Sequence, residues 1–174
     1  EEGGSYKSRM AATGAVSRAT GSAAIPVMAP AQADLMGDNA ILRWDAPEGA
    51  EEGTMYVVKV ENIFNEEIYR EETDKTSVSL DFSDPELAYD MGLYLVKIYK
   101  SDDEEIASNE IGIKKVKSSD KVEIQEDLAN LKSEVADDNA MNKIVYASFF
   151  EENGLILDAL TKYEEAIKMS PDIE

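Results

Sequence analysis

Apolar and polar residues alternate with period 2 in several short runs between positions 37 and 117. In the first run, Ala40, Leu42 and Trp44 fall on one side of the chain, and Ala46 and Pro47 end it. Because successive side chains of a strand point to opposite faces of a sheet, this run predicts a short strand with Trp44, the only tryptophan, in a core. The same alternation recurs with Tyr56, Val58 and Val60, with Val78, Leu80 and Phe82, with Tyr94, Val96 and Ile98, and with Ile106, Ile111 and Ile113 on one last strand.

Turn signals separate these runs. Residues 48–53 form a polar loop, Phe64, Asn65 and Glu66 are typical of a hairpin turn, and residues 101–105 are an acidic turn. Six or seven short strands with such turns between them, and no helical pattern among them, predict an antiparallel β-sandwich over residues 34–117.

After Lys117 the apolar period changes to 3.6. Apolar residues at i, i+4, i+7 and i+11 predict a first amphipathic helix, with Ser118, Ser119 or Asp120 as its N-cap. A second helix is expected over 140–153, capped by residues 137–139, and a third over 155–169, with Gly154 as the stop between them. The fold class is therefore α+β with segregated parts, a sandwich followed by a tail of three helices at 118–174. The stripe of the first helix is Ile124, Leu128, Leu131 and Val135.

The first 33 residues are rich in Gly, Ala and Ser and show no sustained period, so we interpret 1–33 as an extended arm or linker. Lys7, Arg9 and Arg18 make this segment basic, whereas everything after it is acidic. It is either a flexible leader left after processing or an arm that lies on its own body or on a neighbouring copy. Residues 25–28 are a possible first edge strand.

The net charge and the missing residue types exclude several classes of function. The chain of 174 residues carries a net charge of -20, and such a negative field repels phosphate backbones, so no nucleic-acid partner is expected. The absence of His and Cys removes imidazole bases, Cys nucleophiles, disulfides and the usual zinc ligands. No apolar run is long enough to span a membrane. Glu at position 1 and the lack of cysteine are compatible with a removed export signal.

Two local signatures sharpen the sandwich prediction. Asp90-Met91-Gly92-Leu93-Tyr94 resembles the tyrosine corner of immunoglobulin-like domains, whose phenol oxygen bonds back to the upstream backbone. Trp44 followed by Ala46-Pro47 resembles the Trp-x-x-Pro that closes the second strand of fibronectin type III domains. The resemblance covers about residues 25–116 and implies a fibronectin type III or bacterial immunoglobulin-like domain, because the cysteine pair of antibody domains is missing.

The last two predicted helices resemble a single tetratricopeptide repeat over residues 140–173. That motif places small residues and aromatics where two helices pack closely, and it closes with a proline. Lys143 and Tyr146 depart from the usual Trp and Leu. One repeat cannot bury its apolar face, so the first helix and the sandwich, further chain, or a partner must cover it. The matching residues are Ala147, Phe150, Ala159, Tyr163, Ala166 and Pro171.

A weaker resemblance concerns the order of the parts. A β domain followed by Glu152-Asn153-Gly154-Leu155 and Asp158-Ala159-Leu160 is similar to an uncharacterised domain family frequent in cyanobacteria. This resemblance implies an architecture and no activity.

Candidate functional residues are few. Met141, Ile144 and Val145 lie on the repeat side that tetratricopeptide proteins use to hold peptides, and Lys7, Arg9 and Arg18 are candidates on the arm. We interpret Trp44, Tyr94 and the six repeat residues as structural core. Acidic clusters such as 102–105 lack a calcium-loop motif and are interpreted as solvated faces. No catalytic residue, metal ligand or cofactor is assigned.

Three hypotheses follow. The first is a non-catalytic protein interaction or assembly module of an exported bacterial protein, in the periplasm or at the cell surface, with a protein partner. The second is self-assembly, in which the basic arm of one copy docks on the acidic body of the next. The third is a glycan-binding module or a carboxylate-dependent glycan hydrolase.

Overall fold

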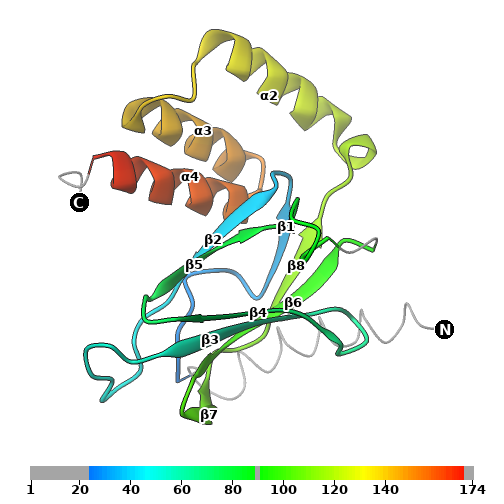
Figure 1. Ribbon diagram of the computed structural model, residues 1–174. Coiled ribbons are helices and arrows are strands. Elements are labelled where there is room, and N and C mark those ends of the chain that lie inside the picture. Colours follow the sequence, from blue (N-terminus) through cyan, green and yellow to red (C-terminus); the bar gives the residue numbers. More distant parts are fainter. Residues whose placement is uncertain (1–23, 89–90, 171–174) are drawn as a thin grey trace.

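The computed structural model describes residues 24–88 and 91–170, and it is an α+β structure with the helices at the C-terminal end (Figure 1). This confirms the predicted class and the segregation of strands from helices. The strands are β1 (Gln32–Leu35), β2 (Asn39–Arg43), β3 (Tyr56–Glu61), β4 (Glu67–Thr73), β5 (Ser77–Asp81), β6 (Leu93–Lys100), β7 (Asp103–Ala107) and β8 (Ile111–Lys115). A 3-10 turn, η1 (Ser118–Asp120), then leads to α2 (Val122–Glu134), α3 (Ala140–Glu152) and α4 (Ile156–Met169).

The strands form two sheets. The larger has the order β1-β8-β6-β3-β4, with β7 also paired to β6, and the smaller consists of β2 and β5. All pairs are antiparallel except β1 with β8, which is parallel, so the larger sheet is mixed and not purely antiparallel as predicted. The cause is the path of the chain, because Val27 first pairs with Trp44 beside β2 and the chain then crosses to the edge of β8.

A single apolar core joins the two sheets. Trp44 is 1% exposed and meets the ring of Tyr56 edge-on at 5.5 Å between centroids. Ile25 is fully buried in the same cluster, and the edge strand begins at Gln32. The β body therefore includes residues 24–33, ten residues that the sequence assigned to the arm. Side chains of both sheets fill this core, among them Ala40, Leu42, Val58, Val60, Val78, Leu80, Tyr94, Val96, Ile98 and Ile113.

The predicted last strand is in fact two strands. β7 and β8 follow one another along the same side of β6, but the Tyr99–Ala107 pair is one residue out of register with the pairs between β6 and β8. At the break, the hydroxyl of Ser108 accepts a hydrogen bond from the Ile98 N–H at 2.9 Å, in place of a backbone carbonyl. A bulge of this kind bends a strand without leaving the partner unsatisfied. β7 begins at Asp103, so the predicted acidic turn is shorter than residues 101–105.

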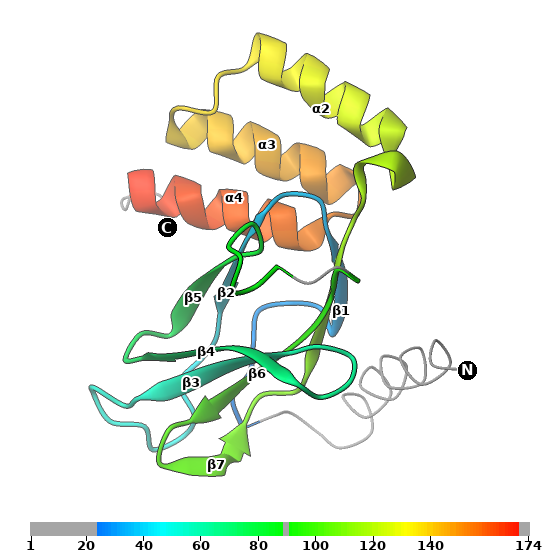
Figure 2. The same ribbon diagram turned by 45° about the vertical axis from the view of Figure 1, so that its right-hand side comes forward.

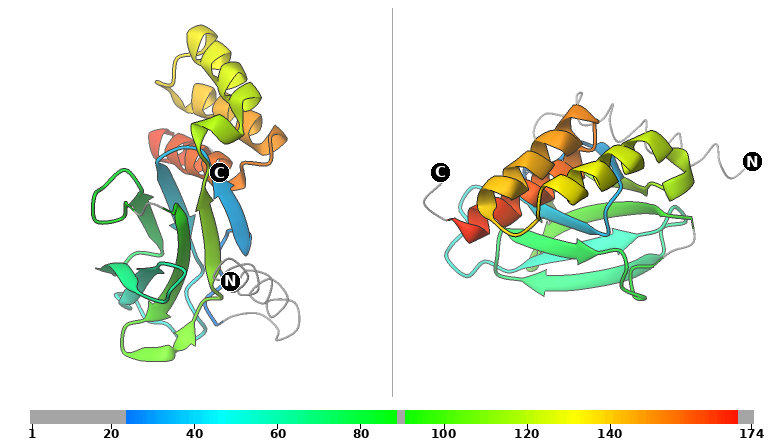
Figure 3. Two further views of the ribbon diagram at one scale, coloured as in Figure 1. Left: turned by 90° about the vertical axis from the view of Figure 1, so that its right-hand side faces the viewer. Right: turned by 90° about the horizontal axis from the view of Figure 1, so that it is seen from above.

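The three helices stack at one end of the β body, with α4 nearest the strands and α2 farthest from them (Figure 2; Figure 3). α3 starts at the N-cap Asn139, whose side chain accepts from the Asn142 N–H, and Gly154 ends the turn with a φ of 72°, both as predicted. α2 differs from the prediction at its start, because η1 occupies the expected cap residues and Lys121 makes no side-chain cap.

Candidate functional site

Asp158 of α4 fixes the helices to the β body. The residue is 4% exposed, and its carboxylate accepts hydrogen bonds from the backbone N–H groups of Met36 at 2.9 Å and Gly37 at 2.6 Å, in the turn between β1 and β2. One turn further along α4, the Thr161 hydroxyl accepts from the Ile41 N–H at 3.0 Å. The side of α4 that faces the strands is therefore not available to a partner.

The position of Asp158 explains why residue 37 is a glycine. A Cβ at position 37 would lie 2.9 Å from Asp158 Oδ1, closer than van der Waals contact allows. Burial raises the pKa of the Asp158 carboxyl, while the two backbone N–H donors and the nearby Lys115 ammonium act in the opposite direction. The Lys115 Nζ also donates to the Met36 carbonyl at 3.0 Å, so the turn is held from both sides.

A cleft of about 490 Å³ separates α2 from the β1–β2 turn and α4. Its apolar floor is formed by Tyr146 and Phe150 of α3. On its rim Asp137 receives two ammonium groups, Lys143 Nζ at 2.9 Å and Lys162 Nζ at 2.6 Å, and Glu165 pairs with the same two lysines. These rim charges are paired with one another and are not directed at an open position for a ligand.

The charged rim makes the junction sensitive to acid. Partial burial of Asp137 disfavours its ionised form, but the hydrogen bonds from Lys162 and Lys143 outweigh that effect and lower the pKa of this carboxyl. A group whose pKa is depressed on folding stabilises the native state above its unfolded pKa of about 3.9, and this contribution is lost as the pH falls through the folded pKa.

We therefore predict that Asp137→Asn lowers the urea midpoint near pH 7 and lowers it by a smaller amount near pH 3, because the wild-type carboxyl begins to lose its charge as the pH falls toward its depressed folded pKa. The expected loss near neutral pH is below about 1 kcal/mol, because the pair is partly exposed and screened by solvent. Urea unfolding of both proteins at the two pH values measures it. A loss of equal size at both pH values would mean that packing, and not charge, is responsible.

Two shallow apolar grooves lie on either side of Ile144. One, of about 280 Å³, is lined by Ile144 of α3 and by Tyr163, Ala166 and Ile167 of α4. The other, of about 330 Å³, runs between α2 and α3, and its lining is Leu131, Ile144, Val145, Ser148, Phe149 and Glu152. We call the surface made by Met141, Ile144, Val145, Tyr163 and Ile167 the hairpin face.

The hairpin face exposes much apolar surface. Met141 is 66% exposed, Val145 39% and Ile167 40%. The Tyr163 hydroxyl donates to Glu151 at 3.0 Å, which holds the ring across the hairpin. Contiguous apolar patches of this kind usually mark sites of interaction on a protein surface.

The hairpin face contains all three residues that the sequence nominates for partner binding, Met141, Ile144 and Val145. Ile167 is not among the residues that the sequence nominates for binding, although its spacing of four residues from Tyr163 places both on one side of a helix. Asp158 is not among them either; its signal is a carboxylate between the apolar residues Leu157 and Ala159. The nominated basic residues Lys7, Arg9 and Arg18 lie outside the described residues.

The residues interpreted as core are mostly buried. Trp44, Tyr94, Ala147, Phe150, Ala159 and Ala166 are all buried, Tyr163 is half-buried and lines a groove, and Pro171 lies outside the described residues.

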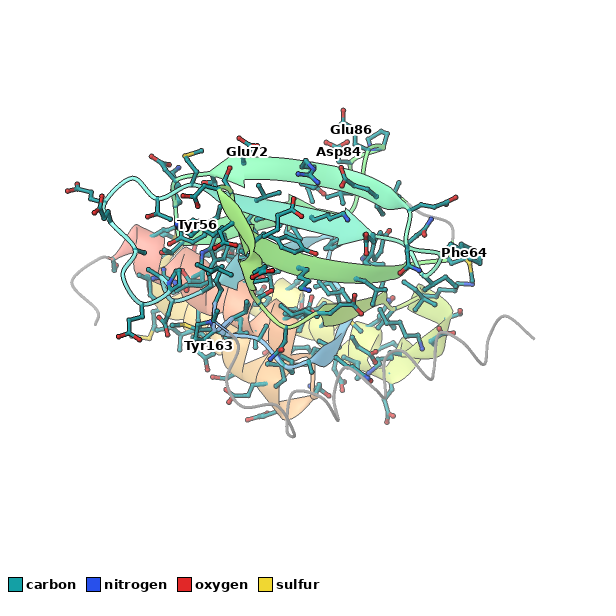
Figure 4. All side chains as sticks on the ribbon, turned by 90° about the horizontal axis from the view of Figure 1, so that it is seen from below. Tyr56, Phe64, Glu72, Asp84, Glu86 and Tyr163 are labelled. Atoms are coloured by element: carbon teal, nitrogen blue, oxygen red, sulfur yellow. The ribbon has the colours of Figure 1, made fainter. Side chains whose placement is uncertain are left out.

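A separate acidic surface lies along β4, at the edge of the larger sheet. Glu72, Asp84 and Glu86 project on this side of the β body (Figure 4). Burial and the carboxylates of Glu71, Glu86 and Asp84 raise the pKa of the Tyr69 phenol to about 12. Charged side chains on an edge strand oppose pairing with another sheet. Within residues 24–88 and 91–170, no group of three or more carboxylates is placed to hold a metal ion.

Comparison with protein-family models finds no match for this chain, and comparison with curated proteins finds no similar sequence. In the described part of the chain no helix combines the length and the apolar character needed to cross a bilayer. The geometry of the hairpin face is therefore the main evidence for what this chain does.

Proposed function

We propose that this chain is a non-catalytic module for protein interaction or assembly, and that the hairpin face is its binding surface. The observation that carries the proposal is the contrast between the two sides of the helical hairpin. One side of α4 is fixed to the strands by Asp158 and Thr161. On the hairpin face, by contrast, Met141 and Val145 of α3 and Ile167 of α4 are exposed to solvent. A helix or an extended peptide can bury this apolar surface.

The two fold resemblances belong to the same proposal. We propose a β-sandwich of the fibronectin type III or immunoglobulin-like class, and this is supported by β2 pairing with β5 in one sheet and by the order β8-β6-β3-β4 in the other. A tetratricopeptide-like hairpin is supported by the packing of α3 on α4, where the buried Ala147, Ala159 and Ala166 leave room for close approach.

The proposal assigns no catalytic role to this chain. A chain without His or Cys has no imidazole base and no thiol nucleophile, and on the rim of the cleft Asp137 and Glu165 are paired with Lys143 and Lys162. Export to the periplasm or surface of a bacterium is part of the proposal and is supported by the lack of cysteine alone.

Substitutions on the hairpin face are expected to weaken peptide binding. Peptides selected from a random library on the wild-type chain should bind Met141→Lys and Val145→Lys at least about tenfold more weakly, because a charge replaces the apolar contact. Fluorescence anisotropy with the selected peptides measures the affinities. Both side chains are exposed, so the substitutions should leave the fold intact.

Met28→Lys is the matched control, because Met28 is 49% exposed but lies on the β body next to the Val27–Trp44 bridge. This variant should bind the selected peptides as the wild type does. If the peptides bind all three variants equally well, the hairpin face is not the binding surface and the proposal fails.

A further inference from the structure

We infer that the hairpin face of one copy binds the N-terminal segment, residues 1–23, of a second copy. This inference rests on the proposed function and names the partner. The resulting contact is head-to-tail, since the two surfaces that meet are different parts of the same chain.

Charge is the first argument. Between Gly3 and Ala33 there is no acidic residue, and Lys7, Arg9 and Arg18 lie in that stretch. Every acidic residue except Glu1 and Glu2 comes later, in a chain with a net charge of -20. Lys7, Arg9 and Arg18 are therefore attracted to the rest of the molecule, and at moderate salt this attraction acts over about 10 Å.

The rim of the hairpin face is acidic. Glu152 lines the groove between α2 and α3, and Glu151 next to it is exposed. On α2, Asp127 and Glu134 lie four residues before and three after Leu131, on the same side of the helix, and both are exposed. Lys168 near the end of α4 is an exposed basic residue on the neighbouring side. The face thus combines apolar grooves with a rim that favours a basic segment.

The size of the grooves suits the side chains of the segment. Grooves of about 280 and 330 Å³ are too shallow for large aromatic clusters but accept methyl groups and a methionine. Residues 10–19, Met-Ala-Ala-Thr-Gly-Ala-Val-Ser-Arg-Ala, supply such side chains next to Arg9 and Arg18. These small apolar side chains would fill the grooves, and the flanking arginines would meet the acidic rim.

The geometry favours a second copy over the same chain. The Ile25 N–H donates to the Ala107 carbonyl at the end of β7, so the described chain begins at the end of the β body that is away from the helices (Figure 1; Figure 2). The eight residues of β6 span about 27 Å of this body, and α4 and α3 add about 9 Å each. The face is therefore roughly 45 Å from Ile25.

The linker predicted for the segment has a root-mean-square span of about 23 Å between Lys7 and Ala24, which falls well short of that distance. An arm that leaves one end of the molecule and a receptor at the other end generate an open chain of copies, or a ring if the rotation closes.

Complementation between two full-length variants tests the inference. One variant carries Lys7→Ser, Arg9→Ser and Arg18→Ser and keeps an intact face, and the other carries Val145→Lys and keeps an intact segment. Light scattering at about 50 mM salt should show a wild-type mass that rises with protein concentration and falls back toward the monomer at about 500 mM salt. Each variant alone should stay monomeric, whereas an equal mixture should give twice the monomer mass and no more.

The mixture also controls for folding, because a variant that failed to fold would not complement the other. A wild-type chain that stays monomeric at every concentration, or a mixture that stays monomeric, overturns the inference. If the peptides selected on the wild type still lose affinity for Val145→Lys in that case, only the identity of the partner is wrong and the proposed function stands. If they bind unchanged, both fail.

Discussion

Replacing Trp44 by alanine is expected to lower the free energy of unfolding by about 4 kcal/mol. The indole is 1% exposed and lies in the core that both sheets share, in contact with the ring of Tyr56. Its removal costs the transfer free energy of a large aromatic side chain and leaves a cavity that strands on both sides cannot fill. A loss of this size exceeds a quarter of the stability of an ordinary domain.

Trp44→Phe is the control that separates packing from hydrogen bonding. The indole Nε1 is buried and has no hydrogen-bond partner among the described residues, so phenylalanine orphans no acceptor and should cost only about 1 to 2 kcal/mol. Urea unfolding followed by far-ultraviolet circular dichroism measures both, since neither variant retains a tryptophan. If Trp44→Ala costs less than about 1 kcal/mol, the indole does not fill the space between the sheets.

The strands with a clear period-2 pattern could be predicted, because the alternation of apolar and polar residues shows which side chains face the core. Val78 and Leu80 of β5 are buried, whereas Ser79 between them is exposed, which is the alternation that a sheet with one covered face imposes. β1 could not be found in this way. Its four residues, Gln32 to Leu35, alternate between polar and apolar, but the run is short and holds only two apolar residues, and its parallel partner β8 lies far along the chain.

Features set by neighbouring residues could be predicted from the sequence, whereas features set by contacts between distant parts of the chain could not. Asn139 and Gly154 act within one helical turn, so their roles could be seen in the sequence. The strand break at Ser108 depends on a hydroxyl that reaches the Ile98 N–H across the sheet. Asp158 depends on two N–H groups more than a hundred residues away. Neither partner is visible in a local pattern.

The binding surface likewise combines a local pattern, which the sequence shows, with a distant contact, which it does not. The apolar spacing on α3 marks Met141, Ile144 and Val145 as one side of a helix, but it does not say whether that side is covered. That is decided by α4, whose Asp158 and Thr161 bind the β body. The side of α4 that carries Tyr163 and Ile167 therefore points away from the strands. The junction therefore determines which side of the hairpin stays exposed.

Removing the Asp158 carboxylate should for this reason disturb the helices more than any other single polar change in the junction. Asp158→Ala leaves the N–H groups of Met36 and Gly37 without their acceptor, and each unsatisfied buried donor costs about 1 to 3 kcal/mol. We expect a loss of about 3 kcal/mol in the free energy of unfolding, together with faster hydrogen exchange in α4 than in β6. Asp158→Asn keeps one acceptor oxygen and should lose less.

Asp127→Ala is the matched control, since it removes an exposed carboxylate from α2 and should change stability by no more than about 0.5 kcal/mol. Urea unfolding compares the three variants, and hydrogen exchange locates the effect. Because Asp158 anchors α4 and does not itself line the hairpin face, peptides selected on the wild type should bind Asp158→Ala more weakly only to the extent that the hairpin is displaced. An Asp158→Ala chain as stable as Asp127→Ala, with unchanged exchange in α4, would show that packing of α4 on β1 and β2 is sufficient to hold the hairpin without this carboxylate.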